Sequence, residues 1–316
     1  MYGVIFLSLL ASVALGAFVI DEIDDDNDNS TPTGDDSVSG GDDSVSRGDD
    51  SVAGGDNSGQ GNDDNAPRGN DRNVIDGTSG NDTITGLFQG DRISSFEGDD
   101  IILASGGSDQ VFAGPGNDFV AGGNVNDTIF GGTGEDVVIG GPANDLVQGN
   151  AGDDLVVGID LGADPSVEDI TALMADTSNA GGVLSGVDGF DLPAAGQDQD
   201  GDDTLLGGSG DDVFLLGGND IATGGAGADA FILGDWSPEG SSATITDYDP
   251  ADEVISYVYT PDGDTAPEVS VTPDAQGNAV VSVNGEEVAV VTGAGATLSA
   301  SDITLIARPP EIPDAA

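Results

Sequence analysis

The chain has 316 residues and a formal net charge of −55, with five arginines, no histidine and no cysteine. The charge excludes nucleic acid and anionic lipid headgroups as partners, and the missing residue types exclude disulfides, thiolate or usual zinc sites, and histidine-based catalysis. A compact fold with so many carboxylates needs a counter-charge, which hard divalent cations such as calcium supply.

Residues 1–20 form a run of apolar and weakly polar side chains, MYGVIFLSLLASVALGAFVI. As a helix this run is long enough to cross about 30 Å of hydrocarbon, so we expect an export signal or a membrane anchor. No Lys or Arg precedes it, and the small residues near Ala14 and Gly16 make a poor cleavage site, which favours an uncleaved anchor.

Residues 21–73 consist almost entirely of Asp, Asn, Gly and Ser, and a seven-residue unit recurs there as GDDSVSG, GDDSVSR, GDDSVAG and GDNSGQG. One valine per unit cannot offset the entropy of ordering the backbone, and like charges extend the chain. The sequence therefore predicts a disordered acidic linker.

From residue 74 to residue 158, aspartate recurs with a fixed step of nine residues, and an aliphatic side chain follows two residues after each one. The aspartates are Asp82, Asp91, Asp100, Asp109, Asp118, Asp127, Asp136, Asp145 and Asp154. A second block at 200–233 continues the pattern with Asp203, Asp212, Asp220 and Asp229, with one residue deleted between Asp212 and Asp220. Glycine-rich hexapeptides precede the aspartates, so each unit is expected to be a turn followed by a short strand.

These units resemble the G-G-x-G-x-D-x-U-x nonapeptide of the RTX (repeats-in-toxin) family. The resemblance implies a parallel β-roll in which two nonapeptides make one coil and the U residues form a thin core. It also implies several Ca²⁺ ions, each held between two loops on the same side by main-chain carbonyls and repeat aspartates. The implied metal-site residues are the thirteen aspartates above together with Gly80, Gly98, Gly114, Gly116, Gly131, Gly132, Gly134 and Gly152.

Stacked carboxylates explain why calcium should control folding. Coils about 4.8 Å apart place two carboxylates where they repel by about 3 kcal/mol at an effective dielectric near 20. The alternative is a solenoid held by its apolar column alone, with solvated aspartates. One aliphatic side chain in nine residues argues against it, because so thin a core cannot offset both strand entropy and this repulsion.

The fourth position of the repeat differs between the two sides of the expected roll. One side has glycine throughout, at positions 80, 98, 116, 134 and 152, whereas the other side reads Gln89, Gly107, Val125 and Ala143. A β-branched residue fits poorly where left-handed φ is required. We therefore expect unequal calcium binding at the two edges.

The remaining segments complete an all-β fold class: a parallel β-roll in two blocks, then an antiparallel β cap. Residues 159–199 break the period and are expected to form a surface insertion with a short helix capped by Asp164 or Ser166 and ending near Met174. Residues 234–308 alternate as β segments, with hairpin signals at Asn284-Gly285 and PDAQGN. Residues 309–316 form a tail.

We expect a calcium-binding protein that is secreted or anchored at the cell surface, with a structural or surface-interaction role and no catalytic residues. The alternative is an accessory calcium-binding part of an extracellular carbohydrate-active or other hydrolytic enzyme system. The sequence leaves open the export route, the protein or surface partner and the number of ions.

Overall fold

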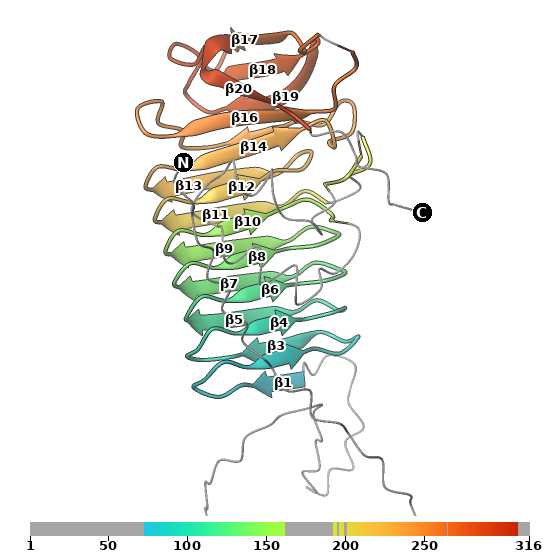
Figure 1. The fold of residues 1–316 in the computed structure, drawn as a ribbon, viewed down its shortest axis with the longest axis vertical. Coiled ribbons are helices and arrows are strands. Elements are labelled where there is room, and N and C mark those ends of the chain that lie inside the picture. The colour runs from blue at the N-terminus through green and yellow to red at the C-terminus, as the bar shows by residue number, and fades with distance from the viewer. Residues whose placement is uncertain (1–72, 162–191, 195, 199–200, 264, 309–316) are drawn as a thin grey trace, which may run out of the picture. The chain divides into compact units, whose positions relative to one another are not determined.

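The computed structural model describes residues 73–161, 192–194, 196–198, 201–263 and 265–308 (Figure 1). These residues form twenty β-strands and one 3₁₀ turn, Ala300–Asp302, and contain no α-helix. The expected all-β class is confirmed. The predicted signal or anchor (1–20), nearly all of the linker, the short helix and the tail lie outside the described residues. Within the described part of the chain, no helix is long and apolar enough to cross a membrane.

Two sheets make up the fold, and each gathers alternate strands of the chain. The eleven-stranded sheet has the order β1-β3-β5-β7-β9-β11-β13-β15-β19-β18-β17, and the nine-stranded sheet has the order β2-β4-β6-β8-β10-β12-β14-β16-β20. The strands of the larger sheet are β1 (Asn73–Asp76), β3 (Asp91–Ser94), β5 (Gln110–Pro115), β7 (Thr128–Thr133), β9 (Leu146–Ala151), β11 (Thr204–Ser209), β13 (Ile221–Ala226), β15 (Ala243–Ile245), β17 (Val269–Pro273), β18 (Ala279–Val283) and β19 (Glu286–Val291). Those of the smaller sheet are β2 (Thr83–Thr85), β4 (Ile101–Leu103), β6 (Phe119–Ala121), β8 (Val137–Ile139), β10 (Leu155–Val157), β12 (Val213–Leu215), β14 (Ala230–Gly234), β16 (Val254–Tyr259) and β20 (Ile303–Ala307).

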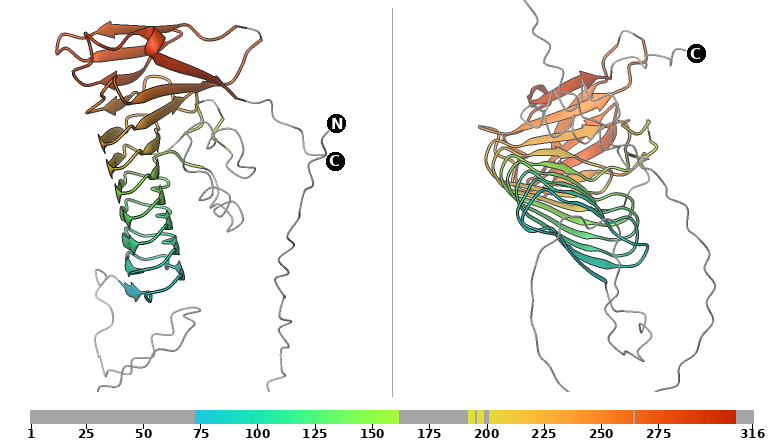
Figure 2. Two further views of the ribbon diagram at one scale, coloured as in Figure 1. Left: turned by 60° about the vertical axis from the view of Figure 1, so that its left-hand side comes forward. Right: turned by 60° about the horizontal axis from the view of Figure 1, so that its bottom comes forward.

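The repeat period becomes a coil of two units. Each strand pairs in parallel with the strand one coil later, so that Val111 faces Ile129 and Ile129 faces Val147. Successive coils therefore superpose residue on residue, as Figure 2 shows. The parallel β-roll is confirmed.

The two blocks of repeats form one continuous roll. Strand β9 pairs directly with β11, with Val147 opposite Leu205, and β10 pairs with β12, with Leu155 opposite Val213. The chain leaves the roll after β10 and returns before β11, so the sheets cross the insertion without a break.

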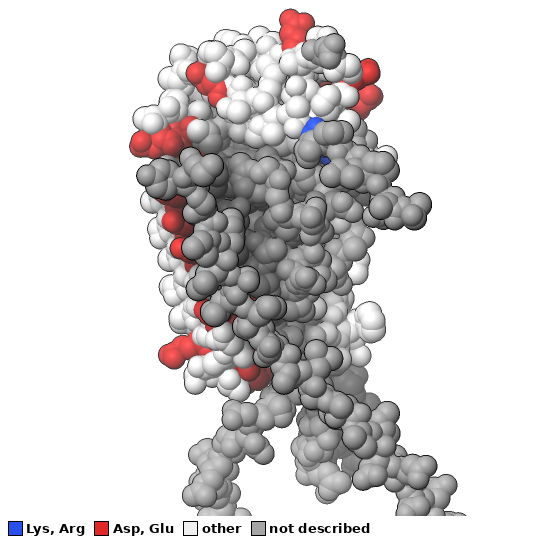
Figure 3. Space-filling view, in the orientation of Figure 1, with Lys and Arg blue, Asp and Glu red and all other residues white. Residues whose placement is uncertain are grey.

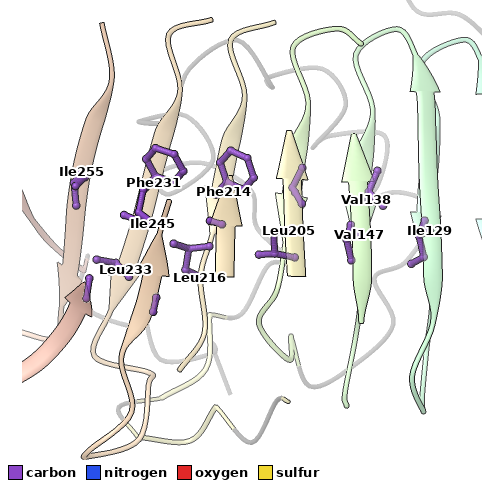
Figure 4. Packing of buried hydrophobic residues seen from close by; sticks show 14 of the residues in the cluster. Ile129, Val138, Val147, Leu205, Phe214, Leu216, Phe231, Leu233, Ile245 and Ile255 are labelled. Atoms are coloured by element: carbon purple, nitrogen blue, oxygen red, sulfur yellow. The ribbon is translucent and has the colours of Figure 1, made fainter. Parts of the chain in front are cut away.

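The core between the sheets is the predicted aliphatic column, which broadens toward the C-terminal end. Phe214 and Phe231 are fully buried on neighbouring strands and stack with ring centroids 5.1 Å apart (Figure 4). A second buried cluster lies on the opposite face of the smaller sheet and includes Phe119, Val137 and Leu155. Strands β6, β8 and β10 are thus buried on both faces, which the sequence analysis did not predict.

The C-terminal region is only partly an antiparallel cap. The predicted antiparallel pairing is confirmed for β17, β18 and β19, and the Asn284-Gly285 loop has positive φ angles of 52° and 90°, as a two-residue hairpin requires. However, β15, β16, β19 and β20 continue the roll in parallel. The chain crosses between the sheets before β15, β16 and β20, which preserves the parallel direction. Strand β19 regains that direction because the antiparallel β18 precedes it.

One contact network fastens the end of β20 to the roll. The Arg308 guanidinium forms a 2.8 Å ion pair with Asp235 and lies 5.5 Å from the ring centroid of the buried Trp236. The Trp236 indole Nε1 donates a 2.8 Å hydrogen bond to the Leu216 carbonyl. This network places the single tryptophan of the chain beside the loop that follows β12.

A pair of phenylalanine variants tests where the core stabilises the roll. In calcium, Phe214→Ala should lower the free energy of unfolding by roughly 3–5 kcal/mol, because it leaves a cavity in a buried stack. Phe112→Ala should lower it by less than half as much, since Phe112 stacks on Phe130 at 5.2 Å but is partly exposed. Urea unfolding of both variants measures the difference, and equal losses would contradict this view of the core.

Candidate metal centre

The structure gathers the repeat aspartates into two columns, one along each edge of the roll. We call the first edge the stack of loops that end in Asp82, Asp100, Asp118, Asp136, Asp154, Asp212 and Asp229. The second edge is the stack of loops that end in Asp91, Asp109, Asp127, Asp145, Asp203 and Asp220. All of these side chains are buried except that of Asp82, which is half-buried in the first loop.

In every coil after the first, one oxygen of the repeat carboxylate belongs to a ladder of hydrogen bonds between coils. The backbone N–H of Asp100 donates to Asp118 Oδ1 at 2.8 Å, and that of Asp118 donates to Asp136 Oδ1 at 2.8 Å, a step of 18 residues. The ladder also crosses the insertion, where the Asp154 N–H donates to Asp212 Oδ1 at 2.9 Å. Each carboxylate is thus held pointing into the stack.

In nine of these aspartates the second oxygen is buried and accepts no hydrogen bond from any residue that the structure describes, whereas Oδ2 of Asp82, Asp91 and Asp220 accepts a backbone N–H. The nine oxygens are Oδ2 of Asp100, Asp118, Asp127, Asp136, Asp145, Asp154, Asp203, Asp212 and Asp229. Burial disfavours the charged form and raises the pKa of Asp127 to about 7, of Asp136 to about 8 and of Asp145 to about 9. A column of ionised, buried oxygens requires positive charge beside it.

Main-chain carbonyl oxygens approach these carboxylates from the next loop of the same edge. A Cβ atom placed on Gly131 would lie 2.6 Å from Asp136 Oδ2 and 2.9 Å from the Gly149 carbonyl oxygen. On the second edge, a Cβ on Gly122 would lie 2.6 Å from both Asp127 Oδ2 and the Gly140 carbonyl oxygen. Carboxylate and carbonyl oxygens are the ligands that calcium prefers, so these residues fit that ion.

The carboxylates alone do not form a cage. Among the described residues, no three acidic side chains gather around one point in a way that could hold a metal ion. Main-chain oxygens therefore have to complete each coordination shell, which matches the flexible geometry of calcium.

Glycine is favoured where the loop backbone bends into left-handed φ. On the first edge the fourth-position glycines Gly98, Gly116, Gly134 and Gly152 have φ between 130° and 145°. The second-position glycines Gly114 and Gly132 have φ of 115° and 134°. Gly131 has ordinary φ and matters because the Asp136 carboxylate fills the space beside it. Gly80, in the outermost loop, also lacks the positive φ expected from its position.

The second edge makes the same bend with less suitable residues. Val125 and Ala143 adopt φ of 78° and 99°, which costs about 1–2 kcal/mol for a residue with a Cβ. At the fourth position these two residues have the positive φ that disfavours a Cβ, but Phe96 and Asn150 of the first edge also have positive φ, of 76° and 84°. Unequal calcium loading stays a prediction.

The first edge also carries an outer ladder that the sequence analysis did not identify. Exposed side chains at the fifth repeat position accept backbone hydrogen bonds between coils, with Asp99 N–H donating to Asn81 Oδ1 and Asn117 N–H donating to Asp99 Oδ1, both at 3.0 Å. Glu135, Asp153 and Asp211 occupy the same position in later coils. The first edge is the side of the roll at which the odd-numbered strands end in Figure 1, and in Figure 3 red acidic atoms lie along that side.

Glu253 is a further acidic group that sequence analysis missed. The Val254 N–H donates to the Asp229 carbonyl at 3.0 Å, just as Val137 donates to Asp118 one coil apart. Glu253 therefore stands where the next aspartate of the first edge would be. Burial raises the pKa of Glu253 to about 7. The loop before it is longer than a repeat loop, so the fixed spacing gave no signal.

Comparison with known proteins agrees with this geometry. The family model of the RTX calcium-binding nonapeptide repeat matches residues 68–95, 94–129, 130–158, 197–218 and 213–235. The β-roll carries RTX calcium-binding nonapeptide repeats. Its repeats bind calcium, and the matched residues contain β1 to β14.

One solved structure similar to the chain is that of the extracellular lipase LipA from Serratia marcescens, with 15% sequence identity and a TM-score of 0.22. The match covers 74% of this chain and 40% of the length of that lipase. No curated protein matches the chain in sequence.

The pKa shifts predict how pH affects the metal-free RTX roll. Because the folded-state pKa values lie above the ordinary 3.8, the stabilising contribution of these aspartates is fully present below about pH 4. It is lost as the pH rises through about 7 for Asp127 and about 8 for Asp136. Circular dichroism in chelator should therefore show more β-structure at about pH 5 than at about pH 8. More β-structure at the higher pH would contradict the burial of unneutralised carboxylates.

Asp118→Ala and Asp127→Ala form a matched pair that tests the asymmetry of the edges. Burial raises the pKa of both carboxyls to about 7, so they differ mainly in their loops. The first-edge loop has Gly116 at φ 145°, whereas the second-edge loop has Val125 at φ 78°. Calorimetric calcium titration should show the larger loss for Asp118→Ala, by up to about tenfold in affinity. An equal or larger loss for Asp127→Ala would show that the residue at the fourth position does not determine the relative calcium affinity of the two edges.

Proposed function

We propose that this chain is an exported protein whose RTX roll folds as it binds several calcium ions. The folded roll then serves a structural or surface-interaction role instead of catalysing a reaction. The observation that carries the proposal is the pair of columns of buried Oδ2 atoms without a hydrogen-bond partner. An ion at each step would neutralise two neighbouring carboxylates at once.

Binding of more than one ion is supported by the repetition of the same oxygens along both edges. The carboxylate and carbonyl oxygens that converge beside Gly122 and Gly131 recur beside Gly207, where Asp212 Oδ2 and the Gly224 carbonyl oxygen converge. Since each coil repeats the arrangement, a single ion would leave most of the buried oxygens without a counter-charge.

Export is supported by the calcium concentration at which such a roll is expected to bind its ions. Extracellular calcium modules bind at roughly 10⁻⁴ to 10⁻³ M, so they fill outside the cell. RTX repeat proteins are typically secreted by bacteria, and the sequence predicts a signal or anchor at residues 1–20. A binding role is favoured over catalysis because the chain has no histidine and no cysteine, which removes the commonest bases and nucleophiles.

Circular dichroism of the full chain in chelator and in calcium tests the proposal. The β-sheet signal should be weak in EDTA and strong at millimolar calcium, because each site filled to a hundred times its Kd stabilises the fold by about 2.7 kcal/mol. Magnesium at the same concentration is the control and should give little β signal, since it demands a smaller octahedral shell. Identical spectra in EDTA and calcium would refute calcium-driven folding.

A further inference from the structure

The second edge of the roll contains an irregular loop at the junction of the two blocks. Gly158 keeps the place of the first repeat glycine, because its N–H donates to the Leu215 carbonyl as the Gly140 N–H donates to the Val157 carbonyl. Asp198 lies where the chain returns from the insertion, and only 2% of its surface is exposed. It is an acid with no counterpart in the regular loops.

The Asp198 carboxylate meets oxygens from two other segments of the chain. A Cβ atom on Gly217 would lie 2.6 Å from Asp198 Oδ2, 2.9 Å from the Gly158 carbonyl oxygen and 3.3 Å from Asp220 Oδ2. Leu216 holds the place of the first glycine in this loop, because its N–H donates to the Ile232 carbonyl, so Gly217 corresponds to the second glycine. In the regular loops, a Cβ atom on the second glycines Gly132 and Gly141 meets main-chain atoms of the neighbouring loop first. The junction therefore offers an additional carboxylate at the same kind of point.

Asp203 supplies a further buried oxygen directed at this place. Its Oδ2 accepts no hydrogen bond from the described residues, and the residue is 1% exposed. A Cβ atom on Gly158 would lie 3.3 Å from this oxygen and 2.6 Å from Asp220 Oδ2. Asp220 Oδ2 also accepts a 2.6 Å hydrogen bond from the Gly217 N–H. These oxygens repel one another unless a cation lies among them.

We propose that a calcium ion binds at this junction, held by the carboxylates of Asp198 and Asp220 and the Gly158 carbonyl, with further main-chain oxygens completing the shell as at the regular sites. The inference rests on the proposed calcium binding of the roll and adds a site that the nonapeptide pattern does not contain. Calcium affinity rises with the charge of the ligand set, so the junction site fills before the regular sites. The ion ties the end of the insertion to both blocks of the roll.

The chain contains its own reporter for this site. Asp198 N–H donates a 3.0 Å hydrogen bond to the Trp236 carbonyl, and the Trp236 indole bonds to Leu216, the residue before Gly217. Trp236 is the single tryptophan of the chain. Terbium, a hard ion that replaces calcium at oxygen sites, should therefore luminesce by energy transfer from Trp236 when it occupies the junction.

The test is a terbium titration of the full chain, excited where tryptophan alone absorbs. In the wild type, the tryptophan-sensitised signal should saturate before the other sites fill, and added calcium should displace the terbium and abolish the signal. Asp198→Asn should lower the terbium affinity of this phase by about tenfold or more. The matched control is Asp202→Asn, because Asp202 is an exposed residue of the same loop whose Oδ1 accepts from Asn219 Nδ2 at 3.1 Å. This control should leave the phase unchanged.

The outcomes separate this inference from the function on which it rests. A wild-type chain that binds neither calcium nor terbium would overturn both. Calcium binding in calorimetry together with equal terbium phases for Asp198→Asn and Asp202→Asn would overturn the junction site alone. If Asp198→Asn does not fold, the order in which the wild-type sites bind ions tests the proposal instead. The proposal would be contradicted if the tryptophan-sensitised terbium signal saturated only after most of the binding seen by calorimetry.

Discussion

The repulsion between carboxylates one coil apart is the constraint on which the rest of this fold depends. Asp118, Asp136 and Asp154 cannot turn away from one another, because each Oδ1 accepts a backbone N–H that fixes the side chain within the stack. The hydrogen bonds that align the coils therefore also bring the Oδ2 atoms together. In the proposed function, forming the roll and forming the metal sites are the same event, and the cation makes the aligned state favourable.

Apolar packing sets how strongly the roll depends on that cation. The aliphatic column between the sheets is narrow, but the smaller sheet buries a second cluster that includes Phe119, Val137 and Leu155. Toward the C-terminal end, Phe214, Phe231 and Trp236 enlarge the core. The C-terminal coils thus have more apolar stabilisation than the first coils, and we infer that they form the base on which calcium orders the remaining loops.

The sequence was informative wherever each coil repeats the contacts of the last. A fixed nine-residue step placed the repeat aspartates correctly in two columns, and its register showed that Val125 and Ala143 fall where the backbone needs positive φ. Glu253 and Asp198 were missed because loops of irregular length precede them, so their positions depend on tertiary structure. The parallel direction of β15 and β20 was missed because half-buried strands alternate in the same way in either direction, whereas Asn284-Gly285 encodes its hairpin locally.

The central claim is that ions lie beside the buried Oδ2 atoms, and anomalous diffraction from crystals grown in calcium tests it most directly. The account predicts anomalous peaks between successive loops along both edges, within about 2.3–2.6 Å of the aspartate Oδ2 and loop carbonyl oxygens. An ordered roll without anomalous density beside Asp118, Asp136 and Asp145 would show that protonation or packing, and not calcium, stabilises the stacked carboxylates.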